Sequence, residues 1–521
     1  MASLLEAEVH SSLLSFLRQR GKHNWPHHLT MARLISRALR LQRPALIQTG
    51  SPATQYSLSY LTPALLSEKP ILLVAPEAIR EHLLQVEIPQ LQEWLQTSKE
   101  ICTGDRILDD FTGLMLTSPQ AWLSDRINNR RRFPQDILTL IDGADELETW
   151  TRECLTVAIE DWHWDELIQA DPNNPDFVKN VKAKLSKEIL SHPKNPYECY
   201  LLEEAELKSL EELLKDLAAC APLPPPFEQY WHRWQQERQM MWVAIDRDRG
   251  QFTLYVAPVE VAAILERVWK QQPVVLMGSF LDSDKNAPVY RKQLGLGELL
   301  CLKFVPNRQN EYIQLYVPDR FPLPNTPEFQ VALLKEVQTL VTECDFLRER
   351  YTGTIKKPII VLVEDVPLKA RVGATMAAQF GSRVRVETTN LAQDGILVCG
   401  WQFWCEERQQ FPTPQLLIIA TLPIPSLENP LVAGRVAYYK RQRQDWFRLY
   451  LLPTALREIQ RAVMPLRESQ GIVALLDNRV NYRSYGSRTL TALEPYARIN
   501  YIDPNWFGKD TDELGIMGVA E

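Results

Sequence analysis

The sequence predicts an α/β protein with two parallel-sheet domains and a helical insertion in the first. Three features of the 521-residue chain support this: short runs of apolar residues, helical segments between most of them, and one long helical stretch that breaks the alternation. Strands that are covered by helices on both faces are apolar throughout rather than at alternate positions. Strands and helices that alternate along a chain favour parallel sheets.

The apolar runs are expected to be buried strands. They lie at 71–76, 137–142, 273–277, 358–363, 396–399, 416–420 and 472–477. The clearest helical segments lie at 78–97, 328–350 and 366–380. We therefore expect these strands in the interior, with helices on both faces of each sheet.

The stretch 147–241 interrupts this alternation. It is rich in Glu, Leu, Lys and Trp, has a helical pattern over 201–220, and contains the proline-rich segment 222–226. Proline-rich segments are stiff linkers. We expect a first domain at 1–146 and 242–281, a helical insertion at 147–241, and a second domain at 282–521 that begins with a connector at 282–330.

Charge and hydropathy limit the classes of function. The net charge of −7 excludes a surface that is basic throughout, but it allows a local basic groove for nucleic acid. No apolar run approaches the roughly 18 residues that span a bilayer, and the N-terminus has no signal-peptide pattern. The scattered cysteines include no C-x-x-C pair, which is typical of reduced thiols. A cytoplasmic protein without a membrane partner is expected.

Several segments carry a recognisable pattern. Residues 416–460 contain a strand, LPIPSLENP and a spaced P-x-A-x-x-x-x-Q, and 471–486 ends in RSYG. Upstream lie ALIQTGSPATQYSLSYLTPALL at 45–66, WVAIDRDRGQFTLYVAPVEVAAIL at 242–264 and ILVCGWQFW at 396–404. In order and spacing these segments resemble the DinG/XPD-type superfamily 2 ATP-dependent DNA helicases. The resemblance implies two RecA-like domains with ATP, Mg²⁺ and single-stranded DNA at their junction, where ATP closes the cleft.

The first helicase motif is a phosphate-binding loop. It needs closely packed glycines, a Lys for the β and γ phosphates, and a Ser or Thr for Mg²⁺. In TGSPATQYS at 49–57, Gly50 and Ser57 stand at matching positions, whereas the Lys position is Tyr56. The later glycines are replaced by residues whose side chains stand where backbone N–H groups should meet phosphate. Either weak nucleotide binding remains, or the turn is kept only for the fold.

The second motif supplies an Asp for Mg²⁺ and a Glu for the attacking water. The resemblance places Asp142 at the Asp position and Gly143 at the Glu position. Glycine has no side chain that could orient water. We expect Asp145, further along, to cap the helix that follows.

The sixth motif supplies arginines to the γ-phosphate. Gln460 and Arg467 match its pattern, but Met464 stands where the first Arg is expected. Such an arginine contributes roughly 10³–10⁵ to the rate, so this replacement predicts weak or no ATPase activity. Pro465 is expected to disturb the helix that carries the motif.

Iron–sulfur members of the family carry four cysteines between the first two motifs. Here the segment from Ser57 to Asp142 contains Cys102 alone. Because the cluster is held by four thiolates, no iron–sulfur cluster is expected. No other metal centre is predicted.

The densest basic and aromatic cluster lies in the second half of the chain. Cations that follow phosphates and rings that stack on bases are typical of single-strand binding. The alternative is an amphipathic helix whose aromatic side chains are buried. The candidate residues for nucleic acid are Tyr439, Lys440, Arg441, Arg443, Trp446 and Arg448.

The leading interpretation is a helicase-fold protein that binds single-stranded DNA or another nucleic acid and has weak or no ATPase activity. One alternative is an active ATP-dependent DNA helicase with an unusual site. Another is a non-enzymatic scaffold whose helical insertion binds a protein partner.

Overall fold

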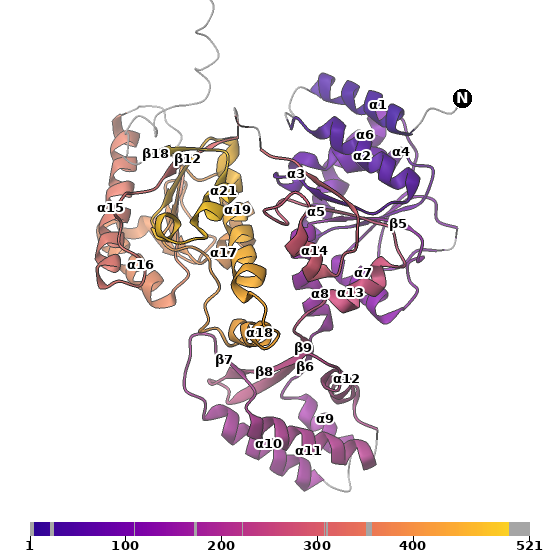
Figure 1. Cartoon of the computed structure of the whole chain (residues 1–521), viewed down its shortest axis with the longest axis vertical. Helices are drawn as coiled ribbons and strands as arrows, with labels where there is room; N and C mark the ends of the chain where they lie inside the picture. The colour runs from indigo at the N-terminus through magenta and orange to yellow at the C-terminus, as the bar shows by residue number, and fades with distance from the viewer. Residues whose placement is uncertain are drawn as a thin grey trace, which may run out of the picture.

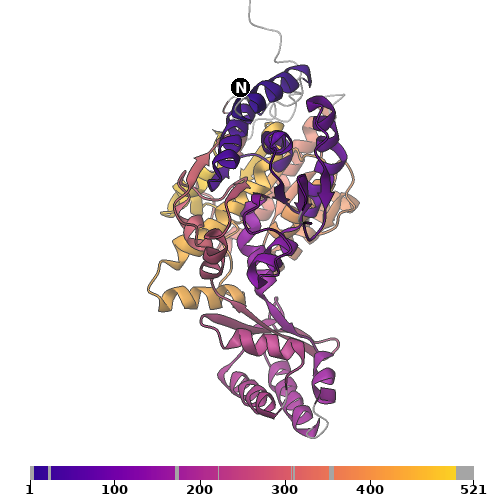
Figure 2. The same ribbon diagram turned by 90° about the vertical axis from the view of Figure 1, so that its right-hand side faces the viewer.

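The computed structural model describes residues 5–20, 25–108, 110–170, 175–220, 222–306, 308, 311–350 and 357–499. Two α/β domains lie side by side, and a smaller lobe lies beneath their junction (Figure 1). The view turned by 90° shows the small lobe projecting away from the pair (Figure 2). The predicted α/β class with two parallel sheets is confirmed.

The first domain is built on a seven-stranded sheet in which every pair is parallel. Its runs are apolar because helices cover both faces. Alternate side chains enter opposite layers, so Leu46 and Ile47 belong to different cores. The strand order is β11 (Leu300–Lys303), β1 (Ala45–Gln48), β10 (Val274–Gly278), β5 (Leu138–Asp142), β2 (Ile71–Val74), β4 (Leu114–Thr117) and β3 (Ile101–Thr103).

Two layers of helices enclose this sheet. One face packs against α1 (Leu5–Arg20), α2 (His28–Leu41), α4 (Leu58–Leu66) and α6 (Ile88–Leu95). The other packs against α7 (Pro119–Asn128), α8 (Leu147–Leu155), α13 (Ala262–Trp269) and α14 (Pro288–Leu294).

The second domain repeats the plan with another seven-stranded parallel sheet. The strand order is β14 (Val384–Val386), β15 (Ile396–Cys399), β13 (Ile359–Leu362), β16 (Leu416–Ile419), β17 (Ile472–Leu475), β12 (Ile313–Tyr316) and β18 (Tyr496–Ile499). One face packs against α15 (Pro327–Arg350) and α16 (Val366–Phe380), which η3 (Gly381–Arg383) follows. The other packs against α17 (Trp401–Glu407), α19 (Leu452–Glu468), α20 (Arg479–Tyr482) and α21 (Gly486–Leu493).

The sequence led us to expect a purely helical insertion, but the small lobe also contains strands. A four-stranded antiparallel sheet runs through it in the order β6 (Val157–Ile159), β9 (Gln251–Pro258), β8 (Gln239–Asp246) and β7 (Cys199–Leu201). Its helices are α9 (His163–Ala170), α10 (Pro175–Leu190), α11 (Glu204–Cys220) and α12 (Pro225–Trp234). Strand β9 and most of β8, which we had assigned to the first domain from residue 242 onwards, therefore belong to the insertion.

The connector between the two domains also differs from the prediction. Strand β11 pairs with β1 in the first sheet, and β12 is the first strand of the second. The expected boundary at 281 is too early, since the first domain extends through β11.

Candidate functional site

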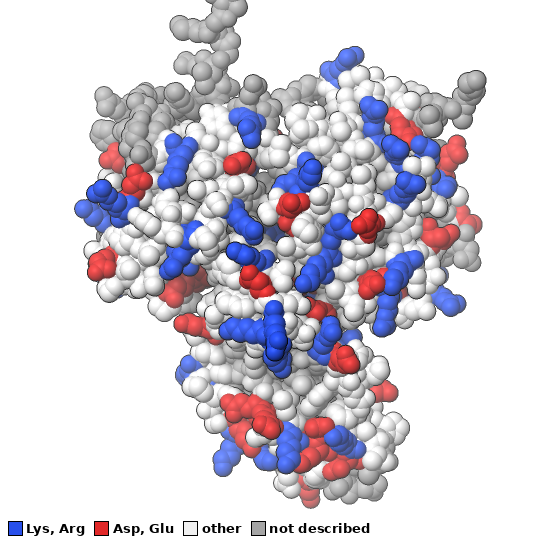
Figure 3. Space-filling view, in the orientation of Figure 1, with Lys and Arg blue, Asp and Glu red and all other residues white. Residues whose placement is uncertain are grey.

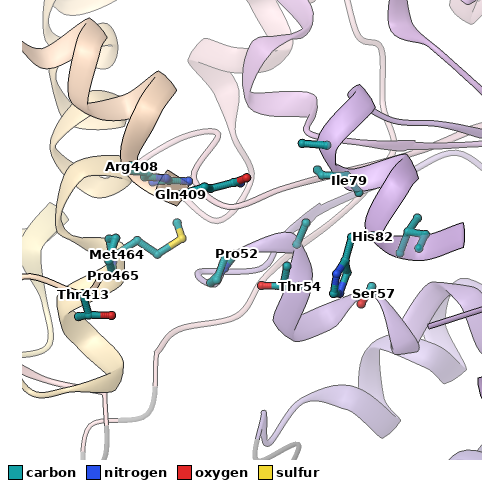
Figure 4. Close-up of a pocket in the computed structure, with 13 residues that line it drawn as sticks. Pro52, Thr54, Ser57, Ile79, His82, Arg408, Gln409, Thr413, Met464 and Pro465 are labelled. Carbon is teal, nitrogen blue, oxygen red and sulfur yellow. The ribbon is translucent and has the colours of Figure 1, made fainter. Parts of the chain in front are cut away.

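A cleft of about 320 Å³ lies between the two α/β domains. The first domain contributes residues 52–54 and Ser57, and the second contributes Thr413, Met464 and Pro465. Figure 4 shows these side chains on opposite walls. The first and sixth motif segments thus line one cleft, as the resemblance to a helicase requires.

The loop in the first wall connects β1 with α3 (Ala53–Tyr56) and α4. Gly50 begins the turn with φ +68°, and a Cβ there would stand 3.1 Å from the carbonyl oxygen of Phe304. Only glycine adopts this backbone without strain beside so close a neighbour. Gly50 is thereby explained by the turn itself.

Tyr56, which the resemblance places at the position of the phosphate-binding lysine, turns inward. Its hydroxyl donates to Asp142 Oδ1, and the hydroxyl of Tyr60 donates to Asp142 Oδ2 at 2.7 Å. The backbone N–H of Gly143 also donates to Oδ1, at 2.8 Å. Asp142 is fully buried. Both of its oxygens are occupied by neutral donors from its own domain.

Burial sets the protonation of this cluster. It raises the pKa of Asp142 to about 6, although the two phenols and the Gly143 N–H lower it in part. Burial, and then the Asp142 charge, raise the pKa of Tyr56 and Tyr60 well above the ordinary value. The tyrosines are therefore protonated donors over the whole physiological range.

A second buried acid lies beside the loop and was not predicted from the sequence. Glu87 belongs to η1 (Leu83–Glu87), a π-helical turn that follows α5 (Glu77–His82). Its carboxylate lies 3.3 Å from His82 Nε2, and burial raises its pKa although the Ser57 hydroxyl and His82 lower it. His82 and Ser57 both line the cleft. A π-turn inside a longer helix often marks a functional position, but the sequence pattern does not reveal it.

Gly143 is required by the local backbone rather than by a ligand. It has φ +79°, and an added Cβ would stand 3.1 Å from the Trp150 ring. The glutamate of a working site would be strained at this position.

Asp145 does not cap the following helix, so our expectation was wrong. Its carboxylate accepts from the backbone N–H groups of Ser279 and Phe280, at 3.0 and 2.7 Å, and from the Ser279 hydroxyl at 2.9 Å. The residue at the N-cap of α8 is Glu146, which makes no side-chain capping bond. Asp145 instead joins η2 (Ala144–Glu146) to the end of β10.

The sixth-motif residues divide between the cleft and the interior. Met464 and Pro465 line the cleft, whereas Gln460 is half-buried outside its lining. Arg467 donates to the carbonyl of Leu493 at 3.0 Å and to those of Glu311 and Pro495 at 3.3 Å, all within the second domain. Burial lowers its pKa to about 10. Helix α19 continues through Pro465 to Glu468, so the predicted disturbance does not end it.

Three arginines that the sequence analysis did not single out cross the domain junction. Arg435 and Arg461 form ion pairs with acidic side chains of the first domain, and Arg457 donates to a backbone carbonyl there. Arginines in amphipathic helices carry no sequence signal that separates such contacts from ordinary surface charge.

The basic and aromatic candidates lie on α18 (Pro430–Arg441), in the turn that follows it and in η5 (Phe447–Leu451). Lys440, Arg441, Arg443 and Arg448 are exposed. In the same orientation as Figure 1, basic side chains gather where the three lobes meet, around α18 (Figure 3). Among the described residues, Arg448 alone of these four has an ion-pair partner, Asp445 at 3.6 Å.

The aromatic members of this cluster are not equivalent. Tyr439 is only 5% exposed and stacks on Tyr450, so its ring is not available to a base. Trp446 is half-buried, and Lys440 Nζ lies 5.3 Å from its ring centre. Trp446 is therefore the better stacking candidate.

Within the described part of the chain, no group of three or more His, Cys, Asp or Glu side chains could hold a metal ion. The same residues include no helix of the length and hydropathy that crossing a membrane requires.

Comparisons with known proteins agree with this geometry. The Helicase C-terminal domain family matches residues 410–496. The ATP-dependent DNA helicase YoaA of Escherichia coli (strain K12) is 30% identical over 267 residues, which are 47% of this chain and 40% of YoaA. The alignment thus spans less than half of that relative.

Solved structures share the fold. A structure titled XPD_Helicase has a TM-score of 0.57 at 12% identity and covers 91% of this chain and 99% of its own. S. tokodaii Xpd4 has a TM-score of 0.56 at 13% identity, with coverage of 91% and 99%. The fold is therefore shared over 91% of this chain.

Proposed function

From the confirmed relationship to the DinG/XPD-type superfamily 2 helicases, we propose that this protein binds single-stranded nucleic acid and hydrolyses ATP weakly or not at all. One observation carries the second half of the proposal. Tyr56 stands in the lysine position and hydrogen bonds to Asp142, the residue that should help to hold Mg²⁺. The Asp142 carboxylate, which would hold Mg²⁺ in a working site, is thereby already hydrogen-bonded within the protein.

The residues of the cleft do not fit MgATP. Mg²⁺ prefers accessible carboxylate oxygens and several waters, but Asp142 is fully buried with both oxygens bonded. Triphosphate needs a lysine and an arginine, and Tyr56 and Met464 supply no charge. Arg408 also lines the cleft, but its guanidinium donates to the backbone carbonyl of Arg461. These features support a chain that keeps the fold of an ATPase without its chemistry.

The exposed cations around α18 support nucleic-acid binding. Lys440, Arg441 and Arg443 are exposed in a chain whose net charge is −7, so a basic surface here is local rather than general. Phosphate contacts of this kind provide most of non-specific affinity. The half-buried Trp446 beside Lys440 could add stacking on a base.

Steady-state ATP hydrolysis tests the first part. With and without single-stranded DNA we expect no rate above background. A rate of about one per second that disappears in Asp142→Ala would contradict the proposal and favour the active helicase. Equilibrium binding of ATP with Mg²⁺ provides a second readout, and we expect no saturable binding at millimolar nucleotide.

Salt-dependent oligonucleotide binding tests the second part. Each phosphate contact adds about one unit to the slope of log affinity against log salt. Arg441→Ala with Arg443→Ala should therefore flatten the slope by up to about two units. The matched control removes two exposed cations elsewhere, Arg249 and Lys270, and should leave the slope unchanged. If the parent does not bind at low salt, a scaffold that binds a protein partner through the insertion becomes the better reading.

A further inference from the structure

Helix α19 presents a single stripe to the first domain. Arg457, Arg461 and Met464 stand at positions i, i+4 and i+7, so they lie along one face of the helix. Met464 lines the cleft. The two arginines lie on the same stripe, N-terminal to Met464, where they contact the first domain directly.

Their acceptors belong to the turn that follows Asp142. Arg461 Nη1 lies 2.6 Å from Glu146 Oε1, and Arg457 Nη1 donates to the Asp145 carbonyl at 2.9 Å. Arg457 is 8% exposed. This turn after Asp142, which would lie beside the nucleotide in a working helicase, is here bound by arginines of the opposite domain.

A third contact is also largely buried. Arg435 Nη2 on α18 lies 2.5 Å from Glu148 Oε1 on α8, with 13% and 15% of these side chains exposed. The guanidinium also lies 3.9 Å from the centre of the Tyr450 ring. Glu148 accepts a second bond from Arg152, at 2.7 Å. Two cations thus share one buried carboxylate.

We infer that these contacts form an interdomain latch that holds the two α/β domains together without nucleotide. The latch consists of Arg435, Arg457 and Arg461 on one side and of Asp145, Glu146 and Glu148 on the other. Glu146 and Glu148 supply to the second domain the negative charge that a bound nucleotide would otherwise supply. Opening would leave buried charges without partners, which is strongly unfavourable.

The latch predicts one arrangement of the domains in every nucleotide condition. A ligand shifts a conformational equilibrium only by its difference in affinity for the two states. Since the side chains of the protein already hold the domains together, added nucleotide has no closure to drive.

The experiment uses the full chain and its outermost contact, because removal of Arg435, whose side chain is only 13% exposed, risks unfolding. The side chains of Arg461 and Glu146 are 21% and 28% exposed. Arg461→Ala, Glu146→Gln and the double variant are compared by hydrogen–deuterium exchange of η2, α8 and α19 and by small-angle X-ray scattering. The control is Glu153→Gln, an exposed residue on α8.

Each single variant should speed exchange at these segments by roughly tenfold, and the control should not. The double variant should add little, because each single change removes the same pair. The radius of gyration of the parent should be identical with and without ATP and Mg²⁺. Additive single effects, unchanged exchange in both single variants, or compaction of the parent by nucleotide would each overturn the latch. ATP hydrolysis without a change of shape would support the latch while contradicting the proposed function.

Discussion

Two buried carboxylates at the domain junction behave in opposite ways. Asp142, behind the cleft, faces two phenols and a backbone N–H, and burial raises its pKa to about 6. Burial also disfavours the charged form of Glu148, which belongs to the latch. The charges of Arg435, Arg152 and Arg457 nevertheless lower its pKa to about 2. The difference shows where Arg435, Arg457 and Arg461 act: they contact acidic side chains or a backbone carbonyl of the first domain. In the described part of the chain, the hydrogen-bond donors to Asp142 are two phenols and a backbone N–H, all neutral.

Removing Arg435 should have the largest effect on the stability of the junction. Arg435→Ala leaves Glu148 with one arginine fewer and removes the contact with Tyr450. We expect a loss of about 3–5 kcal/mol in unfolding free energy, measured by urea denaturation. Arg441→Ala, on the exposed side of the same helix, should change it by less than about 0.5 kcal/mol. Equal effects of the two variants would show that the buried pair has no special role.

Neutralising Asp142 should increase stability, in contrast to the loss expected for Arg435→Ala. The pKa of Asp142 is raised above its ordinary value of 3.8, so the stability contributed by this group falls as pH rises from about 4 to 6 and is then constant. Asp142→Asn should therefore be more stable than the parent by up to about 3 kcal/mol at pH 8, with no gain at pH 4. Thermal unfolding at both pH values measures this.

The control for that variant is Asp136→Asn, since Asp136 is exposed and should show no such pH-dependent gain. A less stable Asp142→Asn at pH 8 would mean that the carboxylate is held as an anion, as in a working Mg²⁺ site.

The aromatic side chains around α18 extend the comparison to Trp446, which is half-buried, and Tyr439, which is buried against Tyr450. Trp446→Ala should weaken binding to a single-stranded oligonucleotide by about 1–3 kcal/mol, the contribution of one stacked base. Tyr439→Phe should leave it unchanged, because that ring is buried against Tyr450. Fluorescence anisotropy at fixed low salt compares the two. Weakened binding in Tyr439→Phe alone would place the nucleic acid elsewhere.

The smallest expected effect is the response of the latch to mild acid. A depressed carboxyl pKa contributes stability that is complete above the ordinary value and is lost only as pH falls towards the folded-state value. Because the pKa of Glu148 is about 2, exchange protection of α8, corrected for intrinsic rates, should be constant from pH 8 to pH 5. Opening near pH 6 would show that a different group controls the junction.

The predictable part of this molecule is its buried framework. The apolar runs around Ile71, Leu138, Val274 and Ile359 became β2, β5, β10 and β13 because strands under two helical layers leave a continuous apolar signal. Several missed strands lack that signal, although β1 and β4 are buried throughout and were not among the predicted runs either. Strand β11 has an exposed first residue, and β8 has a mixed burial pattern that fits either domain.

The sequence predicts which catalytic side chains the site lacks, but not the contacts that take their place. The sequence shows Tyr56 in the lysine position, which removes a charge. It does not show that the phenol reaches Asp142, because 86 residues separate the two and only the sheet brings them together. Tyr439 misled for a similar reason: its neighbours Lys440 and Arg441 are exposed, but the helix turns its ring onto Tyr450.

The position of β1 in its sheet has a consequence for synthesis on the ribosome. Both neighbours of β1, β10 and β11, come from far along the chain, and 229 residues separate Thr49 from its partner Gly278. Domains generally fold as units while the chain emerges, so the inserted lobe is complete before the strands that flank β1 have been made. A nascent or truncated chain that ends before Val274 exposes both edges of β1, and such edges pair readily with other chains.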